Sequence, residues 1–372
     1  MVKIFEKSQI PLPSTLSRRQ LLTALLPSAI GLSLGSIPFQ ASSQPLRATL
    51  SSATQGIPDP TAYTLLVAAP GLPSQERWKQ ILLSALKETL PGGDIQASAV
   101  PGQDGVSGAN QFDTRPENSS HTALLVPGSA IIAALAGDPR VHFDFGRWIP
   151  IFKSLTNCVV VGPQALQHPL QARFRKHSFK VAVSTYIGAE LPTLLALHLL
   201  NFTPLPIVGM GNVDEAVKAL LNREVDIIQM DSKHYADHQD EISKAGFGAL
   251  FSFNATADTR AIPTFSQKYI VERNHPPQGL LYEGWQSLAS ATTLETACVM
   301  PMLTPPQEIA QWRHAINRLL QSQEVVTMAK ENFLTLQSLK ESNDASFNIM
   351  QPSLSAQLAI KRWLTPLLSE WK

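Results

Sequence analysis

Short apolar strands, each followed by a turn rich in Gly or Pro and then an amphipathic helix, recur along this chain from residue 64 onward. The first strand, 64–68, runs into Pro70-Gly71-Leu72-Pro73, after which Trp78, Leu82 and Leu86 recur at helical spacing. Further apolar strands are predicted at 95–100, 123–126, 159–161, 179–183, 205–208 and 225–230. Strand–turn–helix units predict an α/β fold with mainly parallel sheets that helices cover on both faces. In such sheets, ligands bind at the loops that follow the carboxyl ends of the strands.

Helix boundaries are predicted from local signals. Ser74 is expected to cap the helix that follows the first loop, because a serine hydroxyl accepts a hydrogen bond from a free backbone N–H. Thr304-Pro305-Pro306-Gln307 matches a capping box with proline at the first helical position. A last helix is expected from about residue 353 to the terminus.

The N-terminal segment carries a paired arginine. Arg18 and Arg19 stand before a mildly apolar run, 21–39, as in a twin-arginine export signal. Pro27, Gly31 and other turn formers dilute this run, whereas a permanent anchor is usually a denser stretch of Leu, Ile and Val. We expect 1–43 to be a signal peptide and 44–60 a linker, with export to the periplasm by the twin-arginine or the general secretory route. An uncleaved membrane anchor is the alternative.

Length and composition exclude several classes of protein. The chain has 372 residues, which suggests two domains after removal of the signal. Its 30 basic and 29 acidic residues give a net charge of +1, so no electrostatic footprint of a nucleic-acid binder is present. Cys158 and Cys298 are too few for a disulfide framework or a structural zinc site. Both stand in apolar surroundings and are expected to be buried and reduced, although one bridge between them stays open.

Several segments, read in order, resemble one family. They are Pro101–Gly108, Phe143–Ile151, Val213–Ile228, Ile262-Pro263-Thr264, Glu283-Gly284-Trp285 and Leu303–Val325. Each is similar to a motif of the extracytoplasmic solute receptors of the tripartite tricarboxylate transporter system, and the order is shared across residues 62–370. The chain therefore resembles a divergent member of that family.

The resemblance implies a periplasmic-binding-protein fold of type II, a Venus flytrap of two lobes. Lobe 1 would comprise 61–161 and 254–372 and lobe 2 would comprise 162–253, with crossings near 161–165 and 250–254. A small organic acid would bind in the cleft between the lobes. Closure on that acid would present a new surface to the membrane permease subunits of the transporter. The resemblance implies a monomer that is not an enzyme and that needs no cofactor and no metal.

The resemblance also implies that four loops line the cleft. Such loops hold an anion through backbone N–H groups and helix N-termini, so no arginine is required. Serine hydroxyls in these loops could add donors. The candidate ligand-binding residues are Pro70, Gly71, Leu72, Ser74, Gly128, Ser129, Ser184, Thr185, Tyr186, Gly209 and Asp231. The alternative for any one of them is a role in a tight turn.

The chain departs from the family in the first loop and in the loop near residue 209. The first loop normally carries a Gly-Gly pair, where this chain has Gly71-Leu72-Pro73. Proline removes a donor and Leu72 adds bulk where a carboxylate would approach. Ile207-Val208-Gly209 replaces an aromatic-Lys-Gly element. These changes weaken the case for a small dicarboxylate and favour a more apolar acid or a loss of ligand binding.

Other functions were weighed against the receptor. Gly209-Met210-Gly211 suggests dinucleotide binding, but Asp214 at the third position of the motif would repel a pyrophosphate. His234 and His238 share a helix face with Asp231 and Asp240 nearby, where solvated charges are favoured over a metal site. The chain contains no Gly-x-Ser-x-Gly elbow, so an exported enzyme has little support. A binding protein that acts on a membrane sensor is the closer alternative.

Overall fold

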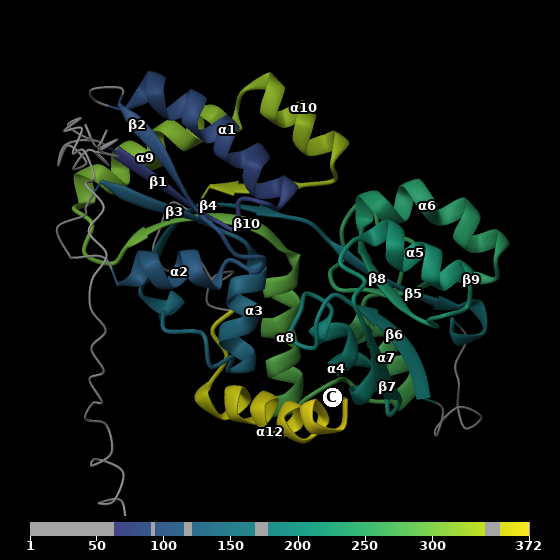
Figure 1. Ribbon diagram of the computed structural model, residues 1–372. Coiled ribbons are helices and arrows are strands. Elements are labelled where there is room, and N and C mark those ends of the chain that lie inside the picture. Colours follow the sequence, from purple (N-terminus) through teal and green to yellow (C-terminus); the bar gives the residue numbers. More distant parts are fainter. Residues whose placement is uncertain (1–62, 91–93, 115–120, 168–177, 339–349, 372) are drawn as a thin grey trace, which may run out of the picture. The chain divides into compact units, whose positions relative to one another are not determined.

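The computed structural model describes residues 63–90, 94–114, 121–167, 178–338 and 350–371 (Figure 1). These residues belong to one compact unit, Gly56–Lys372. The predicted signal peptide 1–43, with Arg18 and Arg19, and the predicted linker 44–60 lie outside the described residues. Within the described ranges, every helix is too short or too polar to cross a bilayer.

A six-stranded sheet forms the centre of lobe 1, with the strand order β11-β4-β10-β3-β1-β2. β1 pairs in parallel with β2 and β3, whereas β10 and β4 join the sheet antiparallel, as does the edge strand β11. The strands are Tyr63–Ala68 (β1), Ile95–Val100 (β2), Thr122–Val126 (β3), Trp148–Leu155 (β4), Leu294–Pro301 (β10) and Thr335–Ser338 (β11).

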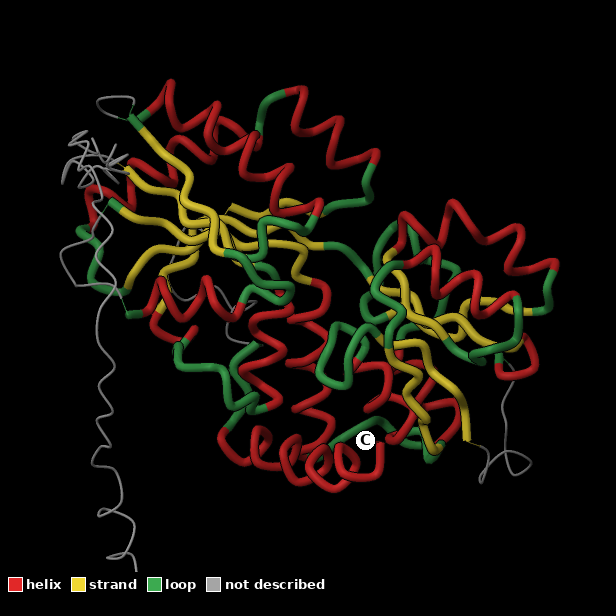
Figure 2. Tube along the Cα trace, in the orientation of Figure 1, coloured by secondary structure: helices red, strands yellow, loops and turns green. Residues whose placement is uncertain are grey.

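Helices cover both faces of this sheet, because its central strands are apolar on both sides (Figures 1 and 2). In β1, Leu65 and Val67 pack under α1 and α9, and Leu66 and Ala68 pack on the opposite face. The first face carries α1 (Pro73–Thr89), α9 (Pro306–Leu320) and α10 (Gln323–Glu331). The second carries α2 (Val106–Asp113), α3 (Gly128–Ala136) and α8 (Leu280–Thr293), with α12 (Leu354–Trp371) packed on α3 and α8.

Lobe 2 contains two smaller sheets. β5 (Cys158–Pro163) pairs antiparallel with β8 (Ile228–Asp231) and with β9 (Phe247–Ser252), while β6 (Ser178–Val183) and β7 (Thr203–Val208) are parallel. α5 (Val213–Leu221) and α6 (Ser232–Lys244) share one apolar cluster with β5 and β8. α4 (Leu191–Leu199) and α7 (Phe265–Arg273) belong to the larger cluster, which continues into α3 and α8 of lobe 1.

One buried amide holds together the two segments that connect the lobes. The chain leaves the first sheet after Leu155 and joins the second at Cys158, whereas the sequence placed this crossing near 161–165. Asn157 lies between them and is 3% exposed. Its Oδ1 accepts the backbone N–H groups of Cys158 and Asn254 at 2.9 and 3.0 Å. Its Nδ2 donates to the Asn254 carbonyl at 2.7 Å and to the hydroxyls of Thr256 and Thr259 at 3.0 and 2.9 Å.

The α/β fold with two lobes is confirmed, although antiparallel strand pairings outnumber the parallel ones that the sequence predicts. Two predicted helix starts are wrong. Ser74 does not cap α1: the N-cap is Leu72, and Pro73 opens the helix. Thr304 forms no capping box, because its hydroxyl donates to the Pro301 carbonyl at 2.8 Å and α9 begins after Pro305. The capping box found in the structure joins Thr264 and Gln267 at the start of α7.

Replacing the bridging amide should loosen the connection between the lobes. We expect Asn157→Ala to lower the free energy of unfolding by about 3 kcal/mol, because it leaves buried backbone and hydroxyl groups without partners. Asn254→Ala is the matched control, since Asn254 is exposed and these bonds involve only its backbone. Chemical denaturation of both variants measures the difference, and equal stabilities would contradict the role given to Asn157.

Candidate functional site

The first predicted loop lies at the carboxyl end of β1 and is open on one side. A Cβ placed on Gly71 would meet no atom within 4 Å. Leu72 and Ser74 are half-buried, and no side chain caps the N-terminus of α1. The N–H groups of the first turn of α1 are therefore free of a side-chain acceptor, as a site for an anion requires.

A buried polar side chain joins this loop to the next one. Gln75 is fully buried, and its Nε2 donates to the Thr296 hydroxyl of β10 at 3.0 Å. The same hydroxyl lies 3.4 Å from the Val126 carbonyl at the end of β3, directly before the predicted loop at Gly128. Gln75 lies on the same helix face as Trp78, Leu82 and Leu86, and a glutamine in that apolar register is the signal that could have identified it from the sequence.

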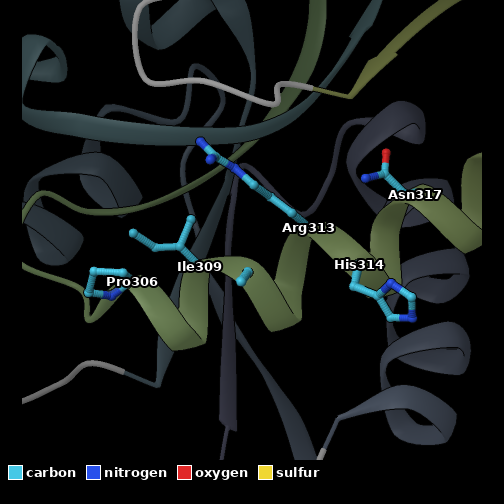
Figure 3. A pocket seen from close by; sticks show the side chains of 6 residues that line it. Pro306, Ile309, Arg313, His314 and Asn317 are labelled. Carbon is cyan, nitrogen blue, oxygen red and sulfur yellow. The ribbon is translucent and has the colours of Figure 1, made fainter.

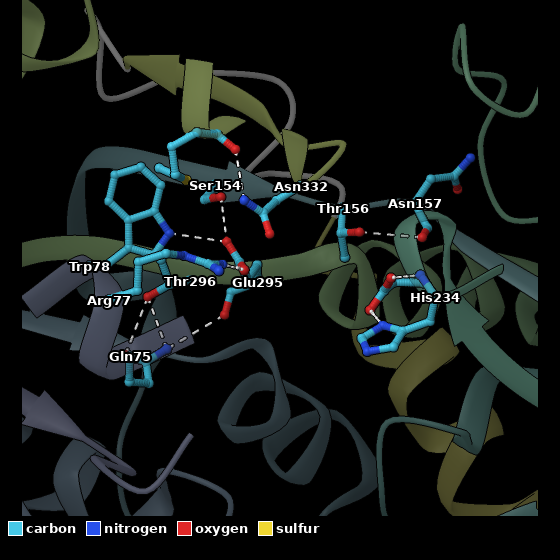
Figure 4. A network of polar contacts seen from close by, with 12 residues as sticks. Gln75, Arg77, Trp78, Ser154, Thr156, Asn157, His234, Glu295, Thr296 and Asn332 are labelled. Carbon is cyan, nitrogen blue, oxygen red and sulfur yellow. Dashed lines mark hydrogen bonds and ion pairs between the residues drawn. The ribbon is translucent and has the colours of Figure 1, made fainter. Parts of the chain in front are cut away.

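Next to this contact, the carboxylate of Glu295 on β10 receives three donors (Figure 4). They are the Arg77 guanidinium, the indole N–H of Trp78 at 3.0 Å and the Ser154 hydroxyl at 2.6 Å. Arg77 is thus held by an internal carboxylate, so the arginine of α1 is already paired within the chain.

The second predicted loop, 127–129, is packed rather than open. A Cβ on Gly128 would lie 1.9 Å from the Ala291 carbonyl and 2.6 Å from the Leu294 carbonyl, at the end of α8. Only glycine permits this approach of α3 to α8. The Ser129 hydroxyl donates to the Asp104 carbonyl at 2.9 Å, which joins this loop to the loop before α2.

The loop after β6 in lobe 2 meets the same end of α8. The Thr292 hydroxyl donates to the Ala189 carbonyl at 3.0 Å. Within the loop, the backbone N–H and the hydroxyl of Ser184 both bond to one carboxylate oxygen of Glu190, at 3.2 and 2.9 Å. The Tyr186 hydroxyl donates to the Trp371 carbonyl of α12 at 2.6 Å, and the two rings stack. Thr185 is exposed.

The last two predicted ligand-binding residues are Gly209, which lies beside this loop, and Asp231, at the end of β8. Gly209 has φ +98°, and its N–H reaches the Ser184 carbonyl at 3.4 Å. Asp231 ends β8 and caps α6, since its Oδ1 accepts the His234 N–H at 2.9 Å. Its Oδ2 lies 2.7 Å from His234 Nδ1 (Figure 4).

Burial acts to raise the pKa of Asp231, but the hydrogen bonds and the charge of His234 outweigh it and lower that pKa. The hydrogen bond that His234 donates to Asp231 raises the pKa of His234.

Glu190 was not identified from the sequence. Burial raises its pKa, although the hydrogen bonds from Ser184 act in the opposite direction. Glu190 and Asp231 both lie close enough to Cys158 for their charges to add to the effect of burial, which raises the pKa of this thiol well above its usual range. Cys158 and Cys298 are buried and free, as predicted. An acid directly before the apolar helix Leu191–Leu199 was the available signal for Glu190.

Two hollows of the described residues lie away from these loops. One, of about 450 Å³, is lined by residues of α9 alone, including Ile309, Arg313 and His314 (Figure 3). The other, of about 290 Å³, lies where the connecting segments meet, at Thr156, Asn157 and Asn254. Neither is lined by a predicted ligand-binding residue. Among the residues placed by the structure, no group of three His, Cys, Asp or Glu side chains could hold a metal ion.

Comparisons with known proteins agree on the fold. No family model matches the chain, and no curated protein matches it. Solved structures do match: a TctC solute-binding protein from Polaromonas has a TM-score of 0.58 at 13% identity, over 82% of this chain and 98% of that one. MatC from Rhodopseudomonas palustris, solved with bound malate, has a TM-score of 0.52 at 18% identity, over 82% and 99%. A second R. palustris protein, solved with adipate, has a TM-score of 0.52 at 12% identity, over 82% and 97%.

This chain has the fold of a solute-binding protein. At these identities the comparison establishes the fold alone. In this fold, three loops that together span more than 100 residues of the sequence, at Gly71, Gly128 and Ala189, are connected through Gln75 and the end of α8.

The two glycines of lobe 1 should respond in opposite ways to a methyl group. We expect Gly128→Ala to lower the free energy of unfolding by about 2–3 kcal/mol, because the new Cβ meets backbone carbonyls that cannot move freely. Gly71→Ala should change stability by less than about 0.5 kcal/mol, because its Cβ enters open space. Thermal or urea unfolding measures both, and a tolerated Gly128→Ala would show that α3 and α8 are less tightly packed than described.

The Asp231–His234 pair should stabilise the protein within a limited pH range. The raised pKa of His234 contributes stability that is present below its unfolded value of 6.5 and is lost as the pH rises through the folded value. The lowered pKa of Asp231 contributes stability that is present above 3.8 and is lost as the pH falls through the folded value.

We therefore expect His234→Gln to lower the free energy of unfolding at about pH 5.5 by less than about 1 kcal/mol, since the pair is partly exposed. The loss should disappear at about pH 9, where both proteins carry a neutral side chain at this position. Unfolding curves at the two values measure it. A loss of stability that is equal at both pH values would show that His234 acts through packing and not through its charge.

Proposed function

We propose that the chain is a periplasmic receptor that captures a small organic acid between its lobes and delivers it to a membrane permease. The observation that carries the proposal is the convergence of loops from both lobes at the end of α8, in the fold of proteins solved with malate and adipate. Loops after strand ends are where ligands bind in α/β folds.

In this proposal, lobe 1 holds the carboxylate. The first turn of α1 and that of α3 begin after Leu72 and Pro127, and neither has a side-chain cap. Pro70, Gly71, Leu72 and Ser74 would contact the ligand, because this loop has space beside it. Gly128 would contribute through its backbone only, since Ala291 and Leu294 occupy the space beside it.

Lobe 2 would close over the ligand with Ser184, Thr185, Tyr186, Gly209 and Asp231. The hydroxyls of Ser184 and Tyr186 already donate to partners within the chain, so a ligand would have to accept from other groups or compete for these. A ligand that contacts both lobes only in the closed state would shift the population of conformers toward that state. The division into lobe 1 (61–161 and 254–372) and lobe 2 (162–253) stays a prediction, and β5 begins at Cys158, four residues before the predicted start of lobe 2.

Binding is tested by thermal unfolding of the purified protein with mono-, di- and tricarboxylates. An acid at ~100 times its dissociation constant should stabilise the protein by about 2.7 kcal/mol, which raises the melting temperature measurably. Gly71→Trp should abolish the shift without lowering the melting temperature of the free protein, because it fills the open side of the first loop.

The outcomes separate the alternatives. A shift with one class of acid that Gly71→Trp removes supports the receptor. A clean transition that no acid shifts would contradict it, and a shift with nicotinamide cofactors alone would favour an exported enzyme.

A further inference from the structure

Some helices of the two lobes differ in whether a side chain caps their N-terminus. In lobe 1, α1 and α3 begin without a side-chain cap. In lobe 2, the Asn212 side chain accepts the Glu215 N–H at 2.8 Å at the start of α5, and Asp231 caps α6. The first turns of α1 and α3 thus have no side-chain acceptor, whereas those of α5 and α6 are capped by side chains of the chain itself.

Glu190 takes the position that a ligand carboxylate would need in the loop after β6. One of its oxygens accepts both the N–H and the hydroxyl of Ser184, at 3.2 and 2.9 Å. This is the arrangement by which a loop and its serine bind a carboxylate, and here the carboxyl group belongs to the chain.

The loop is shaped around that carboxylate. A Cβ at Gly188 would lie 2.7 Å from the Glu190 carboxylate oxygen and 2.5 Å from the Ser184 hydroxyl. Any larger residue at this position would have to displace the hydrogen-bonded groups of Ser184 and Glu190. The backbone of the loop is in turn held by Thr292 of α8, through the Ala189 carbonyl.

The charge in this part of lobe 2 is negative. Glu190 and Asp231 both act on the buried thiol of Cys158, which lies beside Asp231 in the pairing of β5 with β8. The basic side chain of His234 is already paired with Asp231. A second ligand carboxylate placed at this loop would lie close to these acidic side chains, and repulsion between like charges would weaken its binding.

We propose that Glu190 is a specificity-determining residue that occupies the anion-binding donors of lobe 2 and thereby rejects a second carboxylate. The inference rests on the proposed receptor function and narrows its ligand class. The receptor takes solutes with a single carboxylate, which lobe 1 holds, and with a neutral or positively charged group at the far end.

Three six-carbon acids test this directly: hexanoate, 6-aminohexanoate and adipate share a chain length and differ in the far group. Calorimetric titration of the purified protein should give adipate at least about tenfold weaker binding than the better of the other two. In Glu190→Gln that ratio should fall severalfold, because the amide oxygen can still accept from Ser184 but carries no charge.

Asp214→Asn is the matched control, since it also removes one negative charge from lobe 2 but its side chain is 84% exposed. It should leave the ratio unchanged. If Glu190→Gln does not fold, Asp231→Asn serves as the second variant, because its amide oxygen can still cap α6 and the local negative charge falls by one.

The outcomes distinguish this inference from the receptor function. Adipate that binds wild-type protein as tightly as the other acids, or a ratio that Glu190→Gln does not change, overturns the inference and leaves the receptor standing. If wild-type protein binds none of the three acids, adipate binding gained by Glu190→Gln supports the inference, and no gain overturns it. Failure of every acid in the wider series with both proteins removes the receptor function itself.

Discussion

The buried amide of Asn157 is the interaction on which the arrangement of the lobes depends. Its side chain joins the segment between β4 and β5 to the segment that follows β9, so both connections between the sheets are held at one point. Its backbone carbonyl also accepts the Ser232 N–H at 3.0 Å, at the start of α6. A change in the angle between the lobes would therefore move α6 and Asp231 together with the connecting segments.

The end of α8 is the second fixed point, and it explains why loops from distant parts of the chain meet. Ala291 and Thr292 contact Gly128 of lobe 1 and Ala189 of lobe 2. The indole N–H of Trp285, two turns earlier on α8, donates to the Pro192 carbonyl of α4 at 3.1 Å. The proposed site thus lies beside a helix of lobe 1 that contacts both lobes.

Much of the fold could be predicted because it depends on local patterns. Alternating apolar strands and turns located β1, β2 and β3 to within a residue, and the helical face of Trp78, Leu82 and Leu86 is buried as expected. The capping errors at Ser74 and Thr304 have one cause: each helix is opened by a proline, whose position the cap motif alone does not determine. The Thr304 hydroxyl donates to the Pro301 carbonyl, which lies outside the cap motif.

The sequence by itself determined the strands β1, β2 and β3, the burial of both cysteines and the loops that follow these strands, since these depend on periodicity and on turn chemistry close in the chain. Only the tertiary structure decided which donors of those loops are free. Gly71 and Gly128 look alike in sequence, yet one faces open space and the other touches α8. Ser184 looks like a ligand donor until Glu190 is seen to accept from it. The physical reason is that a hydrogen-bond donor binds whichever acceptor the fold brings within reach, and folding brings that acceptor from outside the motif.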